Sequence, residues 1–334
     1  MPYQPDSELA DFIGSIPKTE THLHVEGSMP WELMKEIDPE LYAEPPASFA
    51  DDFKFKSFRE FEDFIIENTG KWFTSAERYH QAAKGIFERC ADSNVKYVET
   101  SFHSGMVAWA NIPGEEIVDA ILDAVPAGMV AHVYMGMLRL DQTPEVVQVL
   151  EDALSWKKLR GIDLHGPEEP PIQDWTPLYF KRAAAAGKAL KAHAGEFGPA
   201  AWVADALDKL GTKRIQHGVR SIEDSAVMKR LVDEDVTLDV CPISNIKLDV
   251  FERMQDHPIK KLAAAGIRCT INTDDPYIFG NTLNEEYAGL AMDLDCTKKE
   301  LIQFARNGWD LADCDVALKS KYLAELDALG ASLA

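Results

Sequence analysis

The feature that most constrains the fold is a regular alternation of eight short apolar or alternating runs with stretches of helical spacing. This alternation predicts βαβ units, in which crossover helices join parallel strands. Eight units in one chain predict an α/β protein with a closed (β/α)8 TIM barrel, whose active site lies at the carboxyl ends of the strands. A doubly wound sheet would carry a glycine-rich phosphate turn after an early strand, and the sequence has none. The eight runs are residues 18–23, 95–102, 131–138, 161–164, 189–193, 214–217, 237–241 and 268–272.

Composition limits the size of the core and the class of partner. The 334 residues are 46% hydrophobic, which supports one large core, so we expect residues 1–334 to form a single barrel domain. The net charge of −22 argues against nucleic acid and anionic membranes as partners, because both require a basic face. The five cysteines lack CxxC spacing, and no signal peptide or membrane-length apolar run is visible, which predicts a cytoplasmic protein with reduced thiols.

One long segment, residues 38–73, interrupts the alternation between the first two runs. It is rich in aromatic residues, and Phe58, Phe61, Phe64 and Ile65 follow helical spacing. One interpretation is a helical insertion packed against the barrel. The other is a lid over the barrel mouth that walls a planar apolar ligand, because insertions after a strand of such a barrel lie on the active face.

Polar residues that can bind a metal or move protons follow six of the eight predicted strands. His22 and His24 are two apart in a strand and therefore point to one face. Barrel closure brings Asp274 or Asp275 beside them, with His193 across the bore. Three imidazoles and one carboxylate suit Zn²⁺ or another borderline divalent ion, with one position left for water. The strand ends carry His22 and His24, Asp163 and His165, His193 and Glu196, His217, Ser244 and Asn245, and Asp274 and Asp275.

The remaining groups supply acid–base chemistry around such an ion. Bound Zn²⁺ lowers the pKa of its water to about 7. His217 is placed to take the proton of that water, and the second aspartate can accept a hydrogen bond from the attacking oxygen and steer the leaving amine. Glu196 can donate a proton to a ring nitrogen if burial raises its pKa. Together these roles predict hydrolytic attack on an aromatic carbon that bears an amino group.

The chain resembles the adenosine/adenine deaminase branch of the amidohydrolase superfamily in six motifs that occur in family order. The resemblance implies one Zn²⁺ per chain and a purine substrate. The motifs are PKTETHLHVEGSM (17–29), GIDLHGPE (161–168), KAHAGE (191–196), RIQHGVRSIED (214–224), CPISNIKL (241–248) and INTDDPYIFG (271–280). The implied metal ligands are His22, His24, His193 and Asp274.

The same resemblance implies roles around the purine. Glu196 would donate a proton to N1, and His217 and Asp275 would stand around the attacking hydroxide. The backbone N–H of Gly166 would meet the ring nitrogen N3. The expected substrate contacts are Gly166, Glu26, His24, Asp275 and His165.

The identity of residue 26 indicates whether the substrate is a free purine base or a nucleoside. Adenosine deaminases usually carry Asp after the HxHx pattern, where it meets the ribose, whereas this chain has Glu26. HxHxEG together with SNxKL is more similar to the bacterial adenine deaminases. A longer carboxylate would fill space that a ribose needs, which favours an adenine-like base converted to a hypoxanthine-like product and ammonia.

Two stretches depart from the family pattern. His165 stands where the family often has a small residue, and residues 100–107 (TSFHSGMV) match neither subgroup. His103 and His165 are therefore either further substrate contacts or polar residues of the rim. Three other histidines, expected to be structural because they lie in helical or strand-core contexts, are His80, His132 and His257.

Other functions are compatible with the same residues. The first alternative is an adenosine or modified adenine-nucleoside deaminase. More distant alternatives are an amidohydrolase that cleaves an ester or lactone, and an inactive binding relative, although the sequence lacks neither a metal ligand nor the proton donor. In each case we expect a small-molecule partner, and a homo-oligomer is compatible with the sequence.

Overall fold

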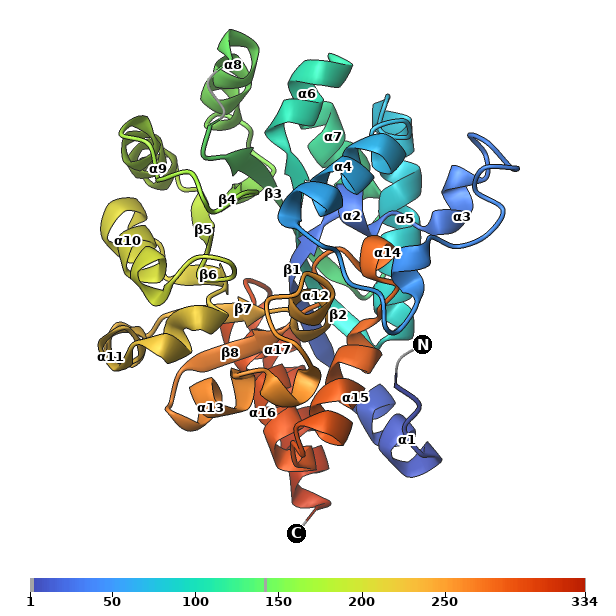
Figure 1. Ribbon diagram of the computed structural model, residues 1–334, viewed down its shortest axis with the longest axis vertical. Coiled ribbons are helices and arrows are strands. Elements are labelled where there is room, and N and C mark those ends of the chain that lie inside the picture. The colour runs from blue at the N-terminus through green and yellow to red at the C-terminus, as the bar shows by residue number, and fades with distance from the viewer. Residues whose placement is uncertain (1–2, 141–142, 334) are drawn as a thin grey trace.

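The computed structural model describes residues 3–140 and 143–333. Eight strands form one sheet in the order β1 to β8, and each strand pairs in parallel with the next. Helices surround the strands (Figure 1). The strands are β1 (Lys18–His24), β2 (Val95–His103), β3 (Val130–Leu138), β4 (Leu159–His165), β5 (Ala189–Ala194), β6 (Arg214–His217), β7 (Thr237–Val240) and β8 (Arg268–Ile271).

The barrel closes between β1 and the chain that follows β8. Leu23 forms a parallel bridge with Asp274. The N–H of His24 donates to the carbonyl of Asp274 at 3.1 Å, and the N–H of Asp274 donates to the carbonyl of His22 at 3.1 Å. The predicted (β/α)8 barrel is therefore confirmed, and each predicted strand ends within two residues of an observed one.

Side-chain caps explain where many of the helices begin. Ser57, for example, accepts a hydrogen bond from the N–H of Glu60 at the start of α4. Thr282 and Thr297 form capping boxes with Glu285 and Glu300. The α-helices are α1 (Ser7–Ser15), α2 (Val25–Ser28), α3 (Trp31–Met34), α4 (Phe58–Thr69), α5 (Ala76–Asp92), α6 (Ser104–Ala110), α7 (Gly114–Asp123), α8 (Pro144–Ala153), α9 (Trp175–Ala185), α10 (Ala200–Leu210), α11 (Ser225–Asp233), α12 (Pro242–Lys247), α13 (Ile259–Ala264), α14 (Pro276–Phe279), α15 (Leu283–Asp293), α16 (Lys298–Leu311) and α17 (Val316–Ala331). The 3₁₀ helices are η1 (Ala47–Phe49), η2 (Val219–Glu223) and η3 (Met254–Asp256).

Buried ion pairs fill the bore of the barrel. Lys191 Nζ lies 2.5 Å from Glu99 Oε2, although β5 and β2 are not neighbours in the sheet, so both side chains point inward. Arg214 bridges Glu99 at 3.2 Å and Asp239 at 2.8 Å. Lys191 Nζ also donates to the carbonyl of Thr21 at 2.6 Å. Because every charge has a partner, the network supports β1 without leaving an uncompensated buried charge.

Helix α4 lies within the 38–73 segment and reaches two loops at the carboxyl ends of the strands. Phe61 stacks on Phe279, which follows β8, with ring centroids 5.6 Å apart and planes at 9°. Phe58 contacts Phe197, which follows β5, edge to face at 5.2 Å. The helix therefore packs against the barrel and also lies on its active face.

Candidate active site

A cavity of about 540 Å³ opens at the carboxyl ends of the strands, beneath α4. Polar groups from the strand ends line one part of it. The wall formed by α4 and α6 is mostly apolar but also carries Glu62 and Glu67. The polar lining comprises His24, Glu26, His103, His165, His193, Glu196, His217, Asp274 and Asp275. The apolar lining includes Phe58, Phe61, Ile65, Met106 and Trp109.

Two of the polar residues adopt a backbone conformation that side chains other than glycine rarely take. His217 has φ of 61° and Asp274 has φ of 67°, both in the left-handed region. Such conformations cost about 1–3 kcal/mol each and persist where the surrounding structure enforces them, often at functional sites. Here they turn the chain sharply at the ends of β6 and β8.

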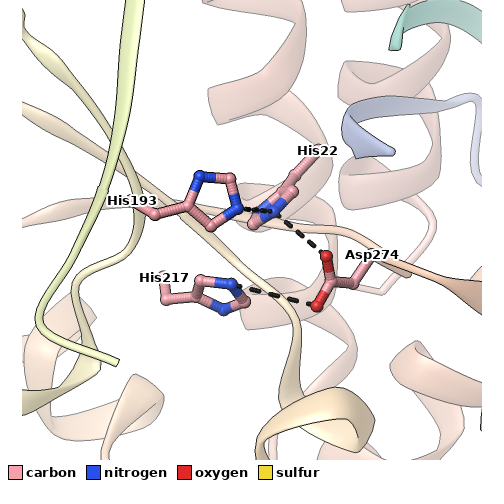
Figure 2. Close-up of side chains that lie close together, drawn as sticks. All are labelled: His22, His193, His217 and Asp274. Carbon is pink, nitrogen blue, oxygen red and sulfur yellow. Dashed lines mark hydrogen bonds and ion pairs between the residues drawn. The ribbon is translucent and has the colours of Figure 1, made fainter. Parts of the chain in front are cut away.

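Four side chains from four strand ends form a compact cluster (Figure 2). The ligand atoms of His22, His193, His217 and Asp274 lie within 4.8 Å of one another. His22 Nε2 lies 3.1 Å from His193 Nε2 and 3.2 Å from Asp274 Oδ1. His217 Nε2 lies 3.8 Å from Asp274 Oδ2.

The hydrogen bonds on the far side of two rings show that a cation fits this cluster. His22 Nδ1 lies 3.0 Å from the carbonyl of Asp239, and His193 Nδ1 lies 3.2 Å from the carbonyl of Leu164. A carbonyl only accepts, so each Nδ1 carries the hydrogen and each Nε2 of a neutral ring presents a lone pair. Two lone pairs 3.1 Å apart repel each other unless a cation lies near both. Backbone carbonyls in this role are typical of metal-binding histidines.

His24 also belongs to this site, although the cluster of four described above contains His217 instead. His24 Nε2 lies 3.2 Å from Asp274 Oδ1, and its Nδ1 lies 2.8 Å from Ser101 Oγ. Ser244 Oγ donates to Asp274 Oδ2 at 2.7 Å, which leaves Oδ1 as the oxygen that faces both His22 and His24. His24 therefore shares Oδ1 of Asp274 with His22, whereas His217 lies nearer to the other oxygen, Oδ2. Burial favours the neutral acid, but the neighbouring imidazoles hold the pKa of Asp274 well below its usual range.

Glu196 is buried beside the cluster. Asn245 Nδ2 donates to its Oε1 at 2.9 Å, and its Oε2 lies 3.4 Å from His217 Nε2. Burial raises the pKa of Glu196 well above its usual value, and the carboxylates of Asp274 and Glu168 add to the effect. The shift favours the protonated acid, which is the form that can donate a proton.

Asp275 is packed against the backbone of α2. A Cβ added to Gly27 would lie 1.6 Å from Asp275 Oδ1, so only glycine leaves room for this carboxylate. Burial raises the pKa of Asp275 well above its usual value, and the adjacent Asp274 contributes further. The structure thus separates the two aspartates: Asp274 contacts the histidines, and Asp275 lies on the side of α2.

Gly166 and His165 follow β4. Gly166 has φ of +76°, and a Cβ there would lie 2.3 Å from Leu138, so glycine is required on both grounds. His165 Nε2 lies 2.9 Å from His103 Nδ1, and both residues line the cavity. Burial lowers the pKa of His165 well below its usual value, and His103 lowers it further.

A second group of possible ligands, His24, Asp163 and His165, adjoins the first. Its atoms are already engaged, since Asp163 Oδ1 lies 3.3 Å from His193 Nδ1 and His165 pairs with His103. Asp163 therefore helps to orient the ring of His193 through its contact with Nδ1.

The structure adds Glu168 and Asn245 to the functional residues that sequence reasoning identified. Glu168 accepts hydrogen bonds at 2.9–3.1 Å from the backbone N–H groups of Gly195, Glu196 and Gly198, and so holds the turn that carries Glu196. The GIDLHGPE motif contains Glu168, but nothing in its spacing indicates this turn. For Asn245, the sequence indicates only a polar residue after a predicted strand.

The described part of the chain contains no helix long and apolar enough to cross a membrane. All five cysteines are free thiols.

Comparison with known proteins identifies the family. The sequence profile of the adenosine deaminase family matches residues 17–329. An adenine deaminase of Hahella chejuensis is 33% identical over 96% of this chain and 98% of its own length. One of Sphingopyxis alaskensis is 34% identical over 96% and 97%. The crystal structure of adenine deaminase from Arthrobacter aurescens has a TM-score of 0.83 and 27% identity, covering 94% of this chain and 98% of that chain. The chain belongs to the adenosine deaminase family.

Proposed function

We propose that this protein catalyses the zinc-dependent hydrolytic deamination of a 6-aminopurine, converting an adenine-like base and water to a hypoxanthine-like product and ammonia. The observation that carries the proposal is the convergence, in one cavity, of the histidine–aspartate cluster with a buried carboxylic acid, Glu196. The adenine deaminase names of the relatives from Hahella and Sphingopyxis support the choice of substrate.

The metal would be held by His22, His24, His193 and Asp274. Three imidazoles and a carboxylate form a donor set that Zn²⁺ prefers. When bound, Zn²⁺ supplies Lewis acidity that lowers the pKa of a water molecule to about 7. The side-chain Oγ of Ser244, on Asp274, and the carbonyls behind His22 and His193 hold the ligands in place.

The remaining residues would move protons and hold the ring. Glu196 gives a proton to N1 of the purine, which makes C6 more electrophilic. His217 and Asp275 hold the attacking water, whose proton passes to this pair as the C6–O bond forms. The same pair then returns that proton to the amino group, the C6–N bond breaks and ammonia leaves. The second hydrogen of the attacking water passes to the Glu196 carboxylate, which leaves a C6 carbonyl and restores the acid. The N–H of Gly166 would bind N3, and His24 and His165 would contact the ring.

Glu26 would exclude a ribose. Its Oε1 accepts hydrogen bonds from Tyr79 Oη at 2.9 Å and from the N–H of His103 at 3.1 Å. This carboxyl group does not swing aside to admit a sugar without losing both bonds, at about 0.5–1.5 kcal/mol each. This restraint supports a free base as substrate.

The size of the cavity favours a second candidate, an adenosine or modified adenine-nucleoside deaminase. A volume of about 540 Å³ falls in the range for drug-sized ligands and exceeds what a purine base alone fills. The apolar walls from α4 and α6 would then surround a substituent on the purine.

The deciding experiment is ammonia release by zinc-loaded protein across adenine, adenosine, N6-substituted adenines and 5′-modified adenosines. Turnover of adenine with little on adenosine supports the first candidate, and preference for a nucleoside supports the second. Release from none of these purines would refute the proposed function. E196Q should bind zinc normally and lose about 10²–10⁴-fold in turnover, because the general acid is gone.

The free cysteines support a reducing, cytoplasmic location as part of the same proposal.

A further inference from the structure

The side chain of Asn245 joins Glu196 to a histidine outside the cavity lining. On one side, Asn245 Nδ2 donates to Glu196 Oε1 at 2.9 Å. On the other side, Asn245 Oδ1 lies 3.1 Å from His257 Nε2. Asn245 and His257 are both buried. The three residues come from the turn after β5, from α12 and from the segment before α13, so only the fold brings them together.

The hydrogen bonds of His257 define its tautomer. The N–H of Ile259 donates to Nδ1 at 3.3 Å, so Nδ1 is an acceptor. In a neutral ring the hydrogen then resides on Nε2, which donates to Asn245 Oδ1. Burial lowers the pKa of His257 to about 3, so the ring is neutral at physiological pH. The ring also packs edge to face on Phe251, with centroids 5.1 Å apart.

This tautomer determines which way the amide of Asn245 points. With the amide reversed, its NH2 group would face the Nε2–H of His257, and its oxygen would face Glu196 Oε1. The reversed amide would lose both hydrogen bonds in a buried site, where each loss costs about 1–3 kcal/mol. The amide nitrogen is therefore held towards Glu196.

The orientation of Asn245 in turn determines which oxygen of Glu196 carries the acidic proton. In a neutral carboxylic acid the carbonyl oxygen accepts hydrogen bonds better than the hydroxyl oxygen, so the bond from Asn245 Nδ2 favours Oε1 as the carbonyl oxygen. The bond from Asn245 thereby favours the proton of the neutral acid on Oε2, the oxygen nearer to His217 Nε2.

We propose that His257 is a positioning residue that acts through Asn245 to keep the proton of Glu196 on Oε2, the oxygen that delivers it to the substrate. The proposal rests on the proposed function for its catalytic consequence, but the hydrogen-bond chain itself does not. His257 is therefore a buried core residue, as the sequence predicts, and it also orients the amide that bonds Glu196.

The first test measures the tautomer without activity. Long-range ¹H–¹⁵N correlation spectra of wild-type protein labelled with ¹⁵N-histidine report which ring nitrogen carries the hydrogen. Comparison with H257F or with H257Q, which also lacks this ring, assigns the signal. We expect the Nε2–H form from pH 6 to pH 9, because burial keeps the ring neutral there. An Nδ1–H form would overturn the proposal.

The second test compares two variants by steady-state kinetics on whichever purine the wild type deaminates best. H257F keeps a ring but removes the donor, and we expect kcat to fall by about tenfold or more with KM changed much less. H257Q restores an N–H near the position of Nε2 and should recover most of the lost kcat. H80F is the matched control, since His80 is a part-buried histidine that bonds the carbonyl of Ala120, and it should keep wild-type kcat.

Each result is decisive. A folded H257F with wild-type kcat, or an H257Q that is as slow as H257F, would overturn the proposal. If H257F does not fold, the tautomer of the wild type and the activity of H257Q decide. If the wild type deaminates no purine, the proposed function fails, whereas an Nε2–H tautomer would still support the chain from His257 to Glu196.

Discussion

Replacing Gly27 with alanine should remove activity without unfolding the protein. Gly27 lies in α2 and has no positive φ, so alanine meets no backbone strain there. Its Cβ, however, would lie 1.6 Å from Oδ1, 2.3 Å from Cγ and 2.6 Å from Cβ of Asp275. The carboxylate must move by more than about 1.5 Å to reach van der Waals contact. Rotation of Asp275 does not suffice, because the Cβ–Cβ contact remains, so the backbone of α2 must also shift.

The expected magnitudes differ for activity and stability. A displacement of about 1 Å in a catalytic group costs about 10²-fold in rate, or about 2.7 kcal/mol in the activation free energy. Overpacking costs about 1–3 kcal/mol of unfolding free energy, and the better helix propensity of alanine offsets up to about 1 kcal/mol. A domain with an unfolding free energy of about 5–15 kcal/mol stays folded under that loss.

The assay for G27A is kcat/KM for ammonia release together with urea unfolding. G14A is the matched control, because Gly14 also lies in a helix, α1, and a Cβ there has no neighbour within 4 Å. G14A should keep wild-type kcat/KM. If G27A kept kcat/KM within about twofold of wild type, Asp275 would not need its observed position, and the reasoning would be wrong.

Three further predictions test the surroundings of the site. Because burial lowers the pKa of His257 to about 3, the unfolded chain binds more protons than the folded one between pH 3 and 6.5. The unfolding free energy of the wild type should therefore fall below pH 6.5 by up to about 1.4 kcal/mol per pH unit relative to H257F, measured by urea unfolding at pH 7 and pH 5. E168Q weakens three backbone hydrogen bonds around Glu196, so kcat should fall by about tenfold or more while KM changes less; an unchanged kcat would contradict the role of Glu168. F61A removes the stack on Phe279, so it should cost about 3 kcal/mol of unfolding free energy and raise KM more than it lowers kcat, and a change confined to kcat would argue against α4 as a substrate wall.

The barrel was predictable because its strands are buried on both faces and are separated by helices. The sequence of such a strand is a short apolar run, and its carboxyl end is marked by the first polar residues after the run. The pairing of His22 with His24 followed from the two-residue period of a strand, and the approach of an aspartate followed from closure of the barrel. Both inferences need only regular backbone geometry.

The parts that sequence could not determine lie where that regularity ends. Strand spacing alone leaves the choice between Asp274 and Asp275 open, and only the resemblance to the family names Asp274. The reason is the left-handed conformation of Asp274, which breaks the two-residue period just past β8. Asn245 lies on α12, after β7, and His257 lies further along the same connection. Their contact with each other and with Glu196 depends on how separate loops pack, and no local spacing encodes that contact.

The position of the proposed metal ligands within the barrel links the proposed chemistry to the closure of the fold. The backbone groups of His22, His24 and Asp274 make the hydrogen bonds that join β1 to the end of β8, while their side chains converge in the cluster. The end of β1 and the residues after β8 therefore close the barrel and also carry three of the proposed ligands. A cation bound by these side chains would also hold the two segments together. The free energy of metal binding would therefore add to the free energy of unfolding. The strain at Asp274 is consistent with this coupling, because a seam that is closed on both sides of the residue can enforce a conformation that costs about 1–3 kcal/mol.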